Sequence, residues 1–307
     1  VSWRRTRFDQ RRQLLKKAAS VLRERVEEFA RTITLEMGKP IREARNEIQK
    51  CAACCDYYAD HGETFLSPEK VDSDASRSYV RFDPIGTVLA VMPWNFPFWQ
   101  VFRFAAPALL AGNTAVLKHS SNVPRSALKI EEVFRASGFP ENTFRTLMIG
   151  SGAVASVIKD DRIKAITLTG SDIAGRRVAE KAGSQIKKTV LELGGSDPFI
   201  ILADADLEQS CTAASQARNI NSGQSCIAAK RFIVEAPIAE TFLARFKERM
   251  ESFVMGDPLD EGTQIGPQAR HDLRDELHAQ VTASVEAGAR LITGGKIPQS
   301  PGAFYNP

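Results

Sequence analysis

Two β-rich runs flank a possible crossover helix in GTVLAVMPWNFPFWQVFRFAAPALLAGNTAVLKHSS, residues 86–121. The segment between the runs, residues 98–112, is long enough for a helix, and parallel strands need such a crossover because a tight turn cannot join them. This stretch therefore predicts one strand–helix–strand unit of a parallel sheet.

The same alternation continues beyond this unit. Further β-rich runs occupy residues 144–150, 164–170, 187–193 and 197–202. Segments long enough for helices, residues 126–138, 151–160 and 171–183, precede the first three of these runs in turn. Repeated alternation is typical of an α/β fold with a Rossmann-type parallel sheet. Ligands of such sheets bind at the carboxyl ends of the strands, so residues there are the first candidates for a site.

Two helices are predicted before this alternation begins. Apolar residues recur at helical spacing from Phe8 to Leu35, and a second helix is expected from about Ile41 to Asp60. Three cysteines of the second helix, Cys51, Cys54 and Cys55, share one helical face. No second ligand pair follows them, so we expect a core helix and no metal site.

Length and composition restrict the class of protein. The chain has 307 residues, is 43% hydrophobic and can form two domains. Its net charge of +4 comes from residues of both signs mixed along the chain, so no nucleic-acid partner is expected. No apolar run is long enough to span a membrane, and a cytoplasmic location without a membrane partner is the default expectation.

Asn95 is the first candidate for chemistry, because it lies between Pro93 and Pro97 at the end of a predicted strand. The two prolines stiffen the loop, and a fixed side-chain amide can stabilise the oxyanion that forms when a nucleophile attacks a carbonyl. A rigid turn packed by Trp94 and Phe96 explains the same residues equally well.

Two other strand ends suggest nucleotide binding. Lys118 ends one strand, which alone is weak support for a ribose or phosphate contact. At Gly170 and Ser171 a strand meets the first turn of a helix, where unpaired N–H groups attract anions. Only two glycines are present there, so the GxGxxG fingerprint is absent, and a simple helix N-cap at Ser171 or Asp172 is the alternative.

Glu192 and Cys226 are the remaining candidates. Glu192 ends an apolar strand just before Gly194 and Gly195, and a carboxylate in a cleft there could act as a general base. An ordinary surface strand end is the alternative for Glu192, but it does not explain the paired glycines. Cys226 is the last residue of the glycine-containing loop NSGQSC, residues 221–226, which could expose a nucleophilic thiolate. Taken alone, that segment favours an ordinary buried cysteine.

Considered together, the motifs resemble the aldehyde dehydrogenase superfamily. They are PWNFP (93–97), KHSS (118–121), TGS (169–171), LELGG (191–195), NSGQSC (221–226) and MGDPLDEGTQIGP (255–267). LELGGSDPFIIL and AAKRFIVE are most similar to bacterial succinate-semialdehyde dehydrogenases that use NAD or NADP. The resemblance implies an NAD(P)-binding domain over residues 1–192 and the first part of an α/β catalytic domain over residues 193–307.

The resemblance also implies catalytic roles. Cys226 would attack the aldehyde, the Asn95 side-chain amide and the Cys226 N–H would hold the oxyanion, and Glu192 would activate the water that hydrolyses the thioester. The implied cofactor contacts come from Trp94, Asn95, Lys118, His119, Ser120, Ser121, Gly170, Ser171 and Leu193. Many NAD-preferring relatives have a glutamate at the place of Ser121, so we expect that NADP is accepted.

Arg103 is the candidate for substrate choice. It lies among apolar residues eight positions after Asn95, about 12 Å along a helix at ~1.5 Å per residue, and it matches the carboxylate-binding arginine of succinate-semialdehyde dehydrogenases. An arginine whose stem covers a buried helix is the alternative. Ile220 replaces a second arginine found in many relatives, and Arg218 lies two residues earlier.

Other functions remain open at this point. By resemblance, the chain begins inside the first long helix and stops short of the usual C-terminus, so a truncated, non-catalytic nucleotide-binding or interaction fragment is one alternative. A dehydrogenase for another aldehyde is a second. A cofactor-free thiol hydrolase is less favoured, because none of the four histidines lies in a recognisable motif. The full-length protein is expected to be a homo-oligomer that acts on a small-molecule aldehyde.

Overall fold

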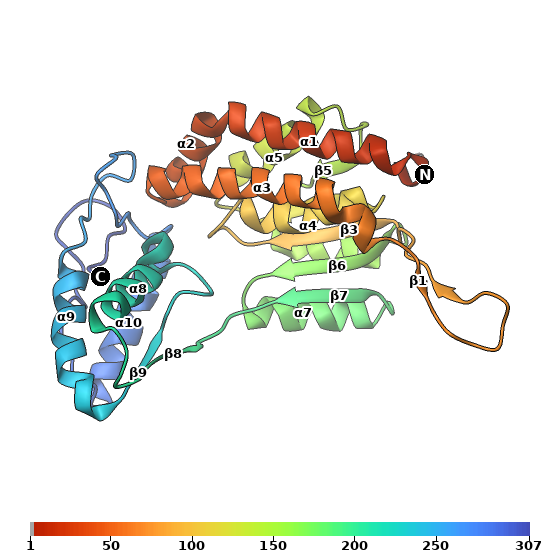
Figure 1. Ribbon diagram of the computed structural model, residues 1–307. Coiled ribbons are helices and arrows are strands. Elements are labelled where there is room, and N and C mark those ends of the chain that lie inside the picture. Colours follow the sequence, from red (N-terminus) through yellow and green to blue (C-terminus); the bar gives the residue numbers. More distant parts are fainter. Residues whose placement is uncertain (1–2) are drawn as a thin grey trace. The chain divides into compact units, whose positions relative to one another are not determined.

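A computed structural model describes residues 3–307, which form two compact units (Figure 1). The first unit comprises the described residues up to Thr32 together with Arg45–Leu193, and the second comprises Ile33–Ala44 with Gly194–Pro307. Each unit is described below by itself.

The first unit begins with helices, continues through a short ribbon and ends in alternating strands and helices. Its elements, two of which extend into the second unit, are η1 (Trp3–Arg5), α1 (Phe8–Glu24), α2 (Val26–Met37), α3 (Ile41–Phe65), β1 (Glu69–Lys70), β2 (Tyr79–Val80), β3 (Thr87–Met92), α4 (Trp99–Leu110), β4 (Thr114–His119), α5 (Pro124–Ala136), β5 (Phe144–Thr146), η2 (Ser151–Ala153), α6 (Val154–Lys159), β6 (Ile163–Thr169), α7 (Asp172–Gly183) and β7 (Lys188–Glu192).

The elements that follow in the chain belong to the second unit. They are β8 (Pro198–Ile201), α8 (Leu207–Asn219), η3 (Ile220–Gly223), β9 (Arg231–Val234), η4 (Ala236–Ile238), α9 (Ala239–Glu251) and α10 (His271–Glu286).

The main sheet of the first unit is parallel and doubly wound. Its strand order is β5-β4-β3-β6-β7, and every neighbouring pair is parallel. The chain moves outward from β3 to β4 and β5, then returns to β6 on the other side of β3. The order therefore reverses between β3 and β6, which is the switch point where such sheets bind ligands.

Helices cover both faces of this sheet. On one face, Leu89, Ile166 and Leu168 pack with Ile158 of α6 and Val178 of α7 in a buried cluster. The alternation of side chains along a strand directs the neighbouring residues to the opposite face, where α4 lies. Phe102 of α4 stacks on Phe134 of α5 with ring centroids 5.2 Å apart, which joins these two helices in the core.

The N-terminal helices differ in one respect from the expectation. The predicted helix from Phe8 to Leu35 is interrupted at Arg25, whose backbone is non-helical (φ −111°, ψ 26°), so α1 and α2 are separate. Arg25 donates to Glu28 and Glu132 at this break. The second predicted helix is confirmed as α3, with Cys51 and Cys55 fully buried on its packed face. Figure 1 shows α1 and α3 running beside α4.

The second unit contains a smaller parallel pair. Strand β8 pairs with β9, and α8 connects them as a crossover. Ile201, Cys211, Ala214 and Phe242 form its buried cluster, against which Phe232 packs. The opposite face of the pair is exposed at Ile200 and Ile233.

The α/β fold with a Rossmann-type parallel sheet is confirmed. Within residues 3–307, no helix has the length and apolarity that a membrane crossing requires. The same residues contain no group of three or more histidines, cysteines or acids arranged to hold a metal ion.

Candidate active site

Asn95 follows the carboxyl end of β3 in a short turn that leads into α4. Its side-chain Oδ1 accepts from the N–H of Phe96 at 3.1 Å, so the Nδ2 group is the donor end of the amide. The amides of Phe98 and Trp99 donate to the Glu47 carboxylate of α3, each at 2.9 Å. The α4 start is therefore anchored, and α4 begins four residues after Asn95 rather than directly at it.

His119 links the Asn95 turn to the next strand end. Its Nδ1 accepts from the Ser120 N–H at 2.9 Å, which places the ring proton on Nε2, and Nε2 lies 2.9 Å from the Pro97 carbonyl oxygen as its donor. Burial lowers the pKa of His119 to about 4 and keeps the ring neutral. One imidazole thus holds two loops at the carboxyl edge of the sheet.

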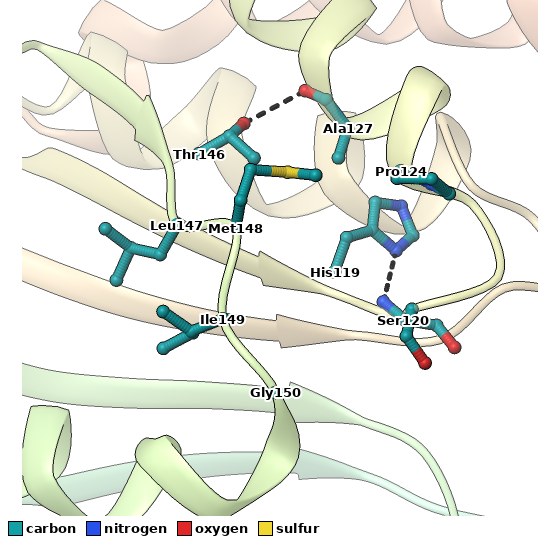
Figure 2. Close-up of a pocket in the computed structure, with 10 residues that line it drawn as sticks. His119, Ser120, Pro124, Ala127, Thr146, Leu147, Met148, Ile149 and Gly150 are labelled. Atoms are coloured by element: carbon teal, nitrogen blue, oxygen red, sulfur yellow. Dashed lines mark hydrogen bonds between the residues drawn. The ribbon is translucent and has the colours of Figure 1, made fainter.

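A cavity of about 200 Å³ opens beside this histidine, at the ends of β4 and β5 (Figure 2). It is lined by His119, Ser120, Ser121, Pro124, Ala127, Thr146, Leu147, Met148, Ile149 and Gly150. Ser121 is exposed, and no carboxylate is among the lining residues. Lys118 is buried at the end of the same strand, and desolvation lowers the pKa of its ammonium.

Gly170 and Ser171 connect β6 to α7. The Ser171 Oγ accepts from the Ala174 N–H at 3.3 Å, so the predicted N-cap is present. The Gly170 N–H donates to the Glu192 carbonyl oxygen at 3.0 Å. A Cβ on Gly175 would lie 2.6 Å from the Leu193 side chain, so this glycine makes the space in which Leu193 packs.

Glu192 and Arg103 meet in a second cavity, of about 440 Å³, between α4 and the open face of β6 and β7. An Arg103 Nη1 atom lies 3.7 Å from a Glu192 carboxylate oxygen, and the other Nη atom donates to the Thr169 Oγ1 at 3.3 Å. Thr169 and Glu192 are paired residues at the ends of β6 and β7, which places their side chains next to each other. Gln100, one turn before Arg103, also lines this cavity, and its buried Oε1 has no hydrogen-bond partner among residues 3–307.

Cys226 is exposed on a loop with an unusual backbone. Asn221, Ser222 and Gly223 have φ values of 55°, 53° and 78°, so three consecutive residues adopt the left-handed conformation. For Asn221 and Ser222 this conformation carries a strain cost of order 1–3 kcal/mol each, which the surrounding contacts must offset.

Those contacts come from segments far away in the chain. The Asn221 N–H donates to the Glu43 carboxylate at 2.7 Å, the Ser222 Oγ accepts from the Gly266 N–H at 2.9 Å, and Gln224 Oε1 accepts from the Ala269 N–H at 2.9 Å. The segment that resembled a superfamily motif, residues 255–267, and the two residues after it therefore support the cysteine loop.

Two cations also bind backbone carbonyls of this loop. Arg218, which is partly buried, donates to Gly223 O at 2.8 Å and to Ala229 O at 2.7 Å. The Lys230 ammonium donates to Cys226 O at 2.6 Å and to Gly195 O at 2.7 Å. Arg218 therefore supports the loop. Its position two residues before Ile220 in the sequence does not indicate this role.

The first unit brings Asn95, His119, Ser120, Ser121, Gly170, Ser171 and Glu192 to the carboxyl edge of one sheet, with Arg103 beside Glu192. Cys226 belongs to the second unit. Sequence reasoning missed the bridging role of His119, the Thr169 contact and the Lys230 contact. Only the β6–β7 register could have indicated Thr169, and no local pattern points to the other two.

Comparisons with known proteins agree on one family. The aldehyde dehydrogenase family profile matches residues 1–307. The chain is 53% identical, over 306 residues, to a probable succinate-semialdehyde dehydrogenase [NADP(+)] of Synechocystis sp., covering all of this chain and 67% of that protein. It is 48% identical to the succinate semialdehyde dehydrogenase [NAD(P)+] of Escherichia coli, covering 99% of this chain and 66% of the other.

Solved structures show the same fold. The structure of a succinic semialdehyde dehydrogenase from Streptococcus pyogenes with NADP+ has a TM-score of 0.97 and 37% identity, covering all of this chain and 68% of that one. A structure from work on cofactor and substrate selection by Gox0499 has a TM-score of 0.98 and 37% identity, covering all of this chain and 67% of that one. The chain thus spans about two thirds of the length of these relatives, and it belongs to the aldehyde dehydrogenase family.

Proposed function

We propose that the protein oxidises succinate semialdehyde to succinate and reduces NADP, with NAD as the alternative cofactor. The main support for this substrate is Arg103, whose guanidinium lies in a cavity of about 440 Å³ beside Glu192. A guanidinium at this place suits a substrate with a carboxylate at its far end. The names of the Synechocystis and Escherichia coli relatives support the same substrate.

In the proposed first step, the Cys226 thiolate attacks the aldehyde carbon and forms a C–S bond. The Asn95 amide and the Cys226 N–H hold the resulting oxyanion. The Phe96 N–H fixes the acceptor end of the Asn95 amide, which orients its donor end. A bound nicotinamide cofactor would supply the hydride acceptor that allows the Cys226 adduct to become a thioester.

In the proposed second step, Glu192 takes a proton from a water molecule. The water oxygen attacks the thioester carbon, the C–S bond breaks, and the Cys226 thiolate leaves as the carboxylic acid is formed. The Lys230 ammonium, held by the Cys226 and Gly195 carbonyls, fixes the loop in both steps.

The residues that would hold the cofactor fit a dinucleotide with an additional phosphate. The cavity beside Ser120 and Ser121 presents hydroxyl groups and no carboxylate, so it offers no charge that repels a 2′-phosphate. The N-terminus of α7, capped by Ser171, suits the pyrophosphate. Because both nitrogens of His119 bind protein groups, we propose that His119 positions Ser120 rather than binding the cofactor through its ring nitrogens.

In this proposal the first unit binds the cofactor and the second carries the nucleophile. We also propose that Trp94 borders the cofactor, that Lys118 meets the adenosine ribose and that Leu193 lies beside the nicotinamide. The cytoplasmic location and the homo-oligomer remain predictions.

The test is reduction of NADP and NAD, followed by absorbance, with succinate semialdehyde and butanal. We expect the highest catalytic efficiency with succinate semialdehyde and NADP, and none after Cys226→Ala. The protein should be purified with any further residues its gene encodes. Strong discrimination against NADP would contradict the cofactor assignment, and no reduction with any aldehyde would favour the alternative of a non-catalytic fragment.

A further inference from the structure

The Arg103 guanidinium has few partners for a group with five N–H donors. Among residues 3–307 its recorded polar contacts are one hydrogen bond to the Thr169 Oγ1 at 3.3 Å and the 3.7 Å approach to Glu192. The second distance is too long for a direct hydrogen bond, so attraction between the two charges is the main interaction. Both side chains are partly exposed, at 38% for Arg103 and 54% for Glu192.

A carboxylate that binds Arg103 through two hydrogen bonds would form a stronger contact than Glu192 does. Charge-assisted bidentate pairs are among the strongest hydrogen bonds in proteins, whereas exposed ion pairs contribute little. A second anion at Arg103 would also repel the Glu192 carboxylate. The guanidinium therefore cannot hold both groups equally well.

We propose that the pair between Arg103 and Glu192 restrains the general base, and that the carboxylate of the substrate releases it. Before substrate binds, Arg103 holds Glu192 beside Thr169. When the far carboxylate of the aldehyde or of its thioester occupies Arg103, Glu192 becomes available to accept a proton from water. Hydrolysis then speeds up for substrates that carry a second anionic group.

This inference rests on the proposed function, because it assigns a second role to Arg103 within the same site. It makes Arg103 a positioning residue for Glu192 as well as an anchor for the substrate. Selection for a carboxylate would therefore appear in the hydrolysis step and not in affinity alone.

The test supplies the acyl group and the carboxylate of the substrate as two separate molecules. Cys226 is acetylated with p-nitrophenyl acetate, and loss of the acetyl group is followed by intact-protein mass spectrometry with and without propionate. Acetyl groups on other residues are subtracted with Cys226→Ala. The acetyl thioester has no carboxylate, so propionate can supply one to Arg103 from solution.

We expect propionate to accelerate hydrolysis about two- to fivefold, the range that release from an exposed ion pair allows. In Arg103→Gln the basal rate should already be raised by this factor, and propionate should add nothing. Arg103→Lys should keep part of the response. Lys188→Gln, which changes another cation lining the same cavity, should keep all of it.

The proposal is overturned if propionate has no effect on the wild-type protein, or the same effect on Arg103→Gln. In either case, a wild-type protein that still reduces NADP with succinate semialdehyde retains the proposed function. If Cys226 takes up no acetyl group and no cofactor is reduced, the proposed function and this inference both fail.

Discussion

In the second unit, the loop before Cys226 contains three consecutive left-handed residues and is held by two cations and by hydrogen bonds from Gly266 and Ala269. In the first unit, Glu192 ends a strand and is held through its side chain by one partly exposed arginine 3.7 Å away. The loop of the nucleophile thus has many supporting contacts, whereas the side chain of the base contacts a single charged partner. A thiol must meet its substrate in one geometry, whereas a base that acts only on the thioester can take different positions in the two steps.

The largest expected effect concerns the support of the cysteine loop. Arg218→Met removes the two charge-assisted hydrogen bonds to Gly223 and Ala229 but retains much of the volume. Because the two carbonyls lose a charged partner at a partly buried place, we expect the free energy of unfolding to fall by about 3 kcal/mol. Alkylation of Cys226 should also become less uniform in rate. Urea unfolding measures the first effect and thiol-labelling kinetics the second.

Arg245→Met is the matched control, since Arg245 makes one exposed contact with Glu208 at 4.0 Å. We expect its effect on unfolding to stay within about 0.5 kcal/mol. Similar losses in both variants would mean that the cysteine loop is not specially supported.

The second prediction concerns the pH dependence of stability through His119. Its pKa is lowered to about 4 in the folded protein against 6.5 when unfolded, so its neutral form stabilises the fold above pH 6.5. As the pH falls from 6.5 toward 4, His119 binds a proton in the unfolded chain but stays neutral in the folded protein. From pH 7 to 5 we expect a loss of about 2 kcal/mol from this residue.

His119→Gln, which does not titrate, should lack this part of the loss. Thermal or urea unfolding of both proteins at several pH values gives the comparison. Parallel curves for the two proteins would show that His119 titrates normally and that its link to the Asn95 turn is loose.

The smallest expected effect concerns the start of α7. Ser171→Ala removes the N-cap, which costs about 1 kcal/mol of stability. Ser171→Asp can keep the cap but adds a negative charge where the pyrophosphate is proposed to bind. We therefore expect Ser171→Asp to retain stability and to raise the KM for NADP, and a KM that stays unchanged in Ser171→Asp would argue against a phosphate at this helix end.

Much of the sheet could be predicted from sequence because each strand and crossover helix has its own local pattern. The order of strands and helices in the first unit, from residues 86–121 to Glu192, follows that pattern closely. The division of the N-terminal helices could not be predicted in this way. At the break between α1 and α2, Arg25 donates to the Glu132 carboxylate of α5 at 2.7 Å. A partner more than 100 residues away leaves no trace in the local sequence.

The candidate site shows the same limit. The motifs indicated the candidates Asn95, Glu192 and Cys226, but only the set of motifs together favoured an exposed nucleophile over a buried cysteine. The contact between Arg103 and Glu192 depends on the register of β6 and β7 and on the position of α4 over them. The support of the cysteine loop by Arg218 depends on the left-handed backbone of the loop, which the loop sequence alone does not predict.

The register of β7 also bears on which insertions and deletions the gene can tolerate. Thr169 faces Glu192 across the pair, and side chains alternate along each strand. Deleting one codon within Lys188–Leu191 would bring Leu191 or Leu193 to the face that Glu192 occupies and send the carboxylate into the apolar side of the sheet. The same deletion in the turn before β7, where Ile186 is 97% exposed, would preserve this phase. Length variation among natural sequences should therefore concentrate in that turn and be absent from the strand.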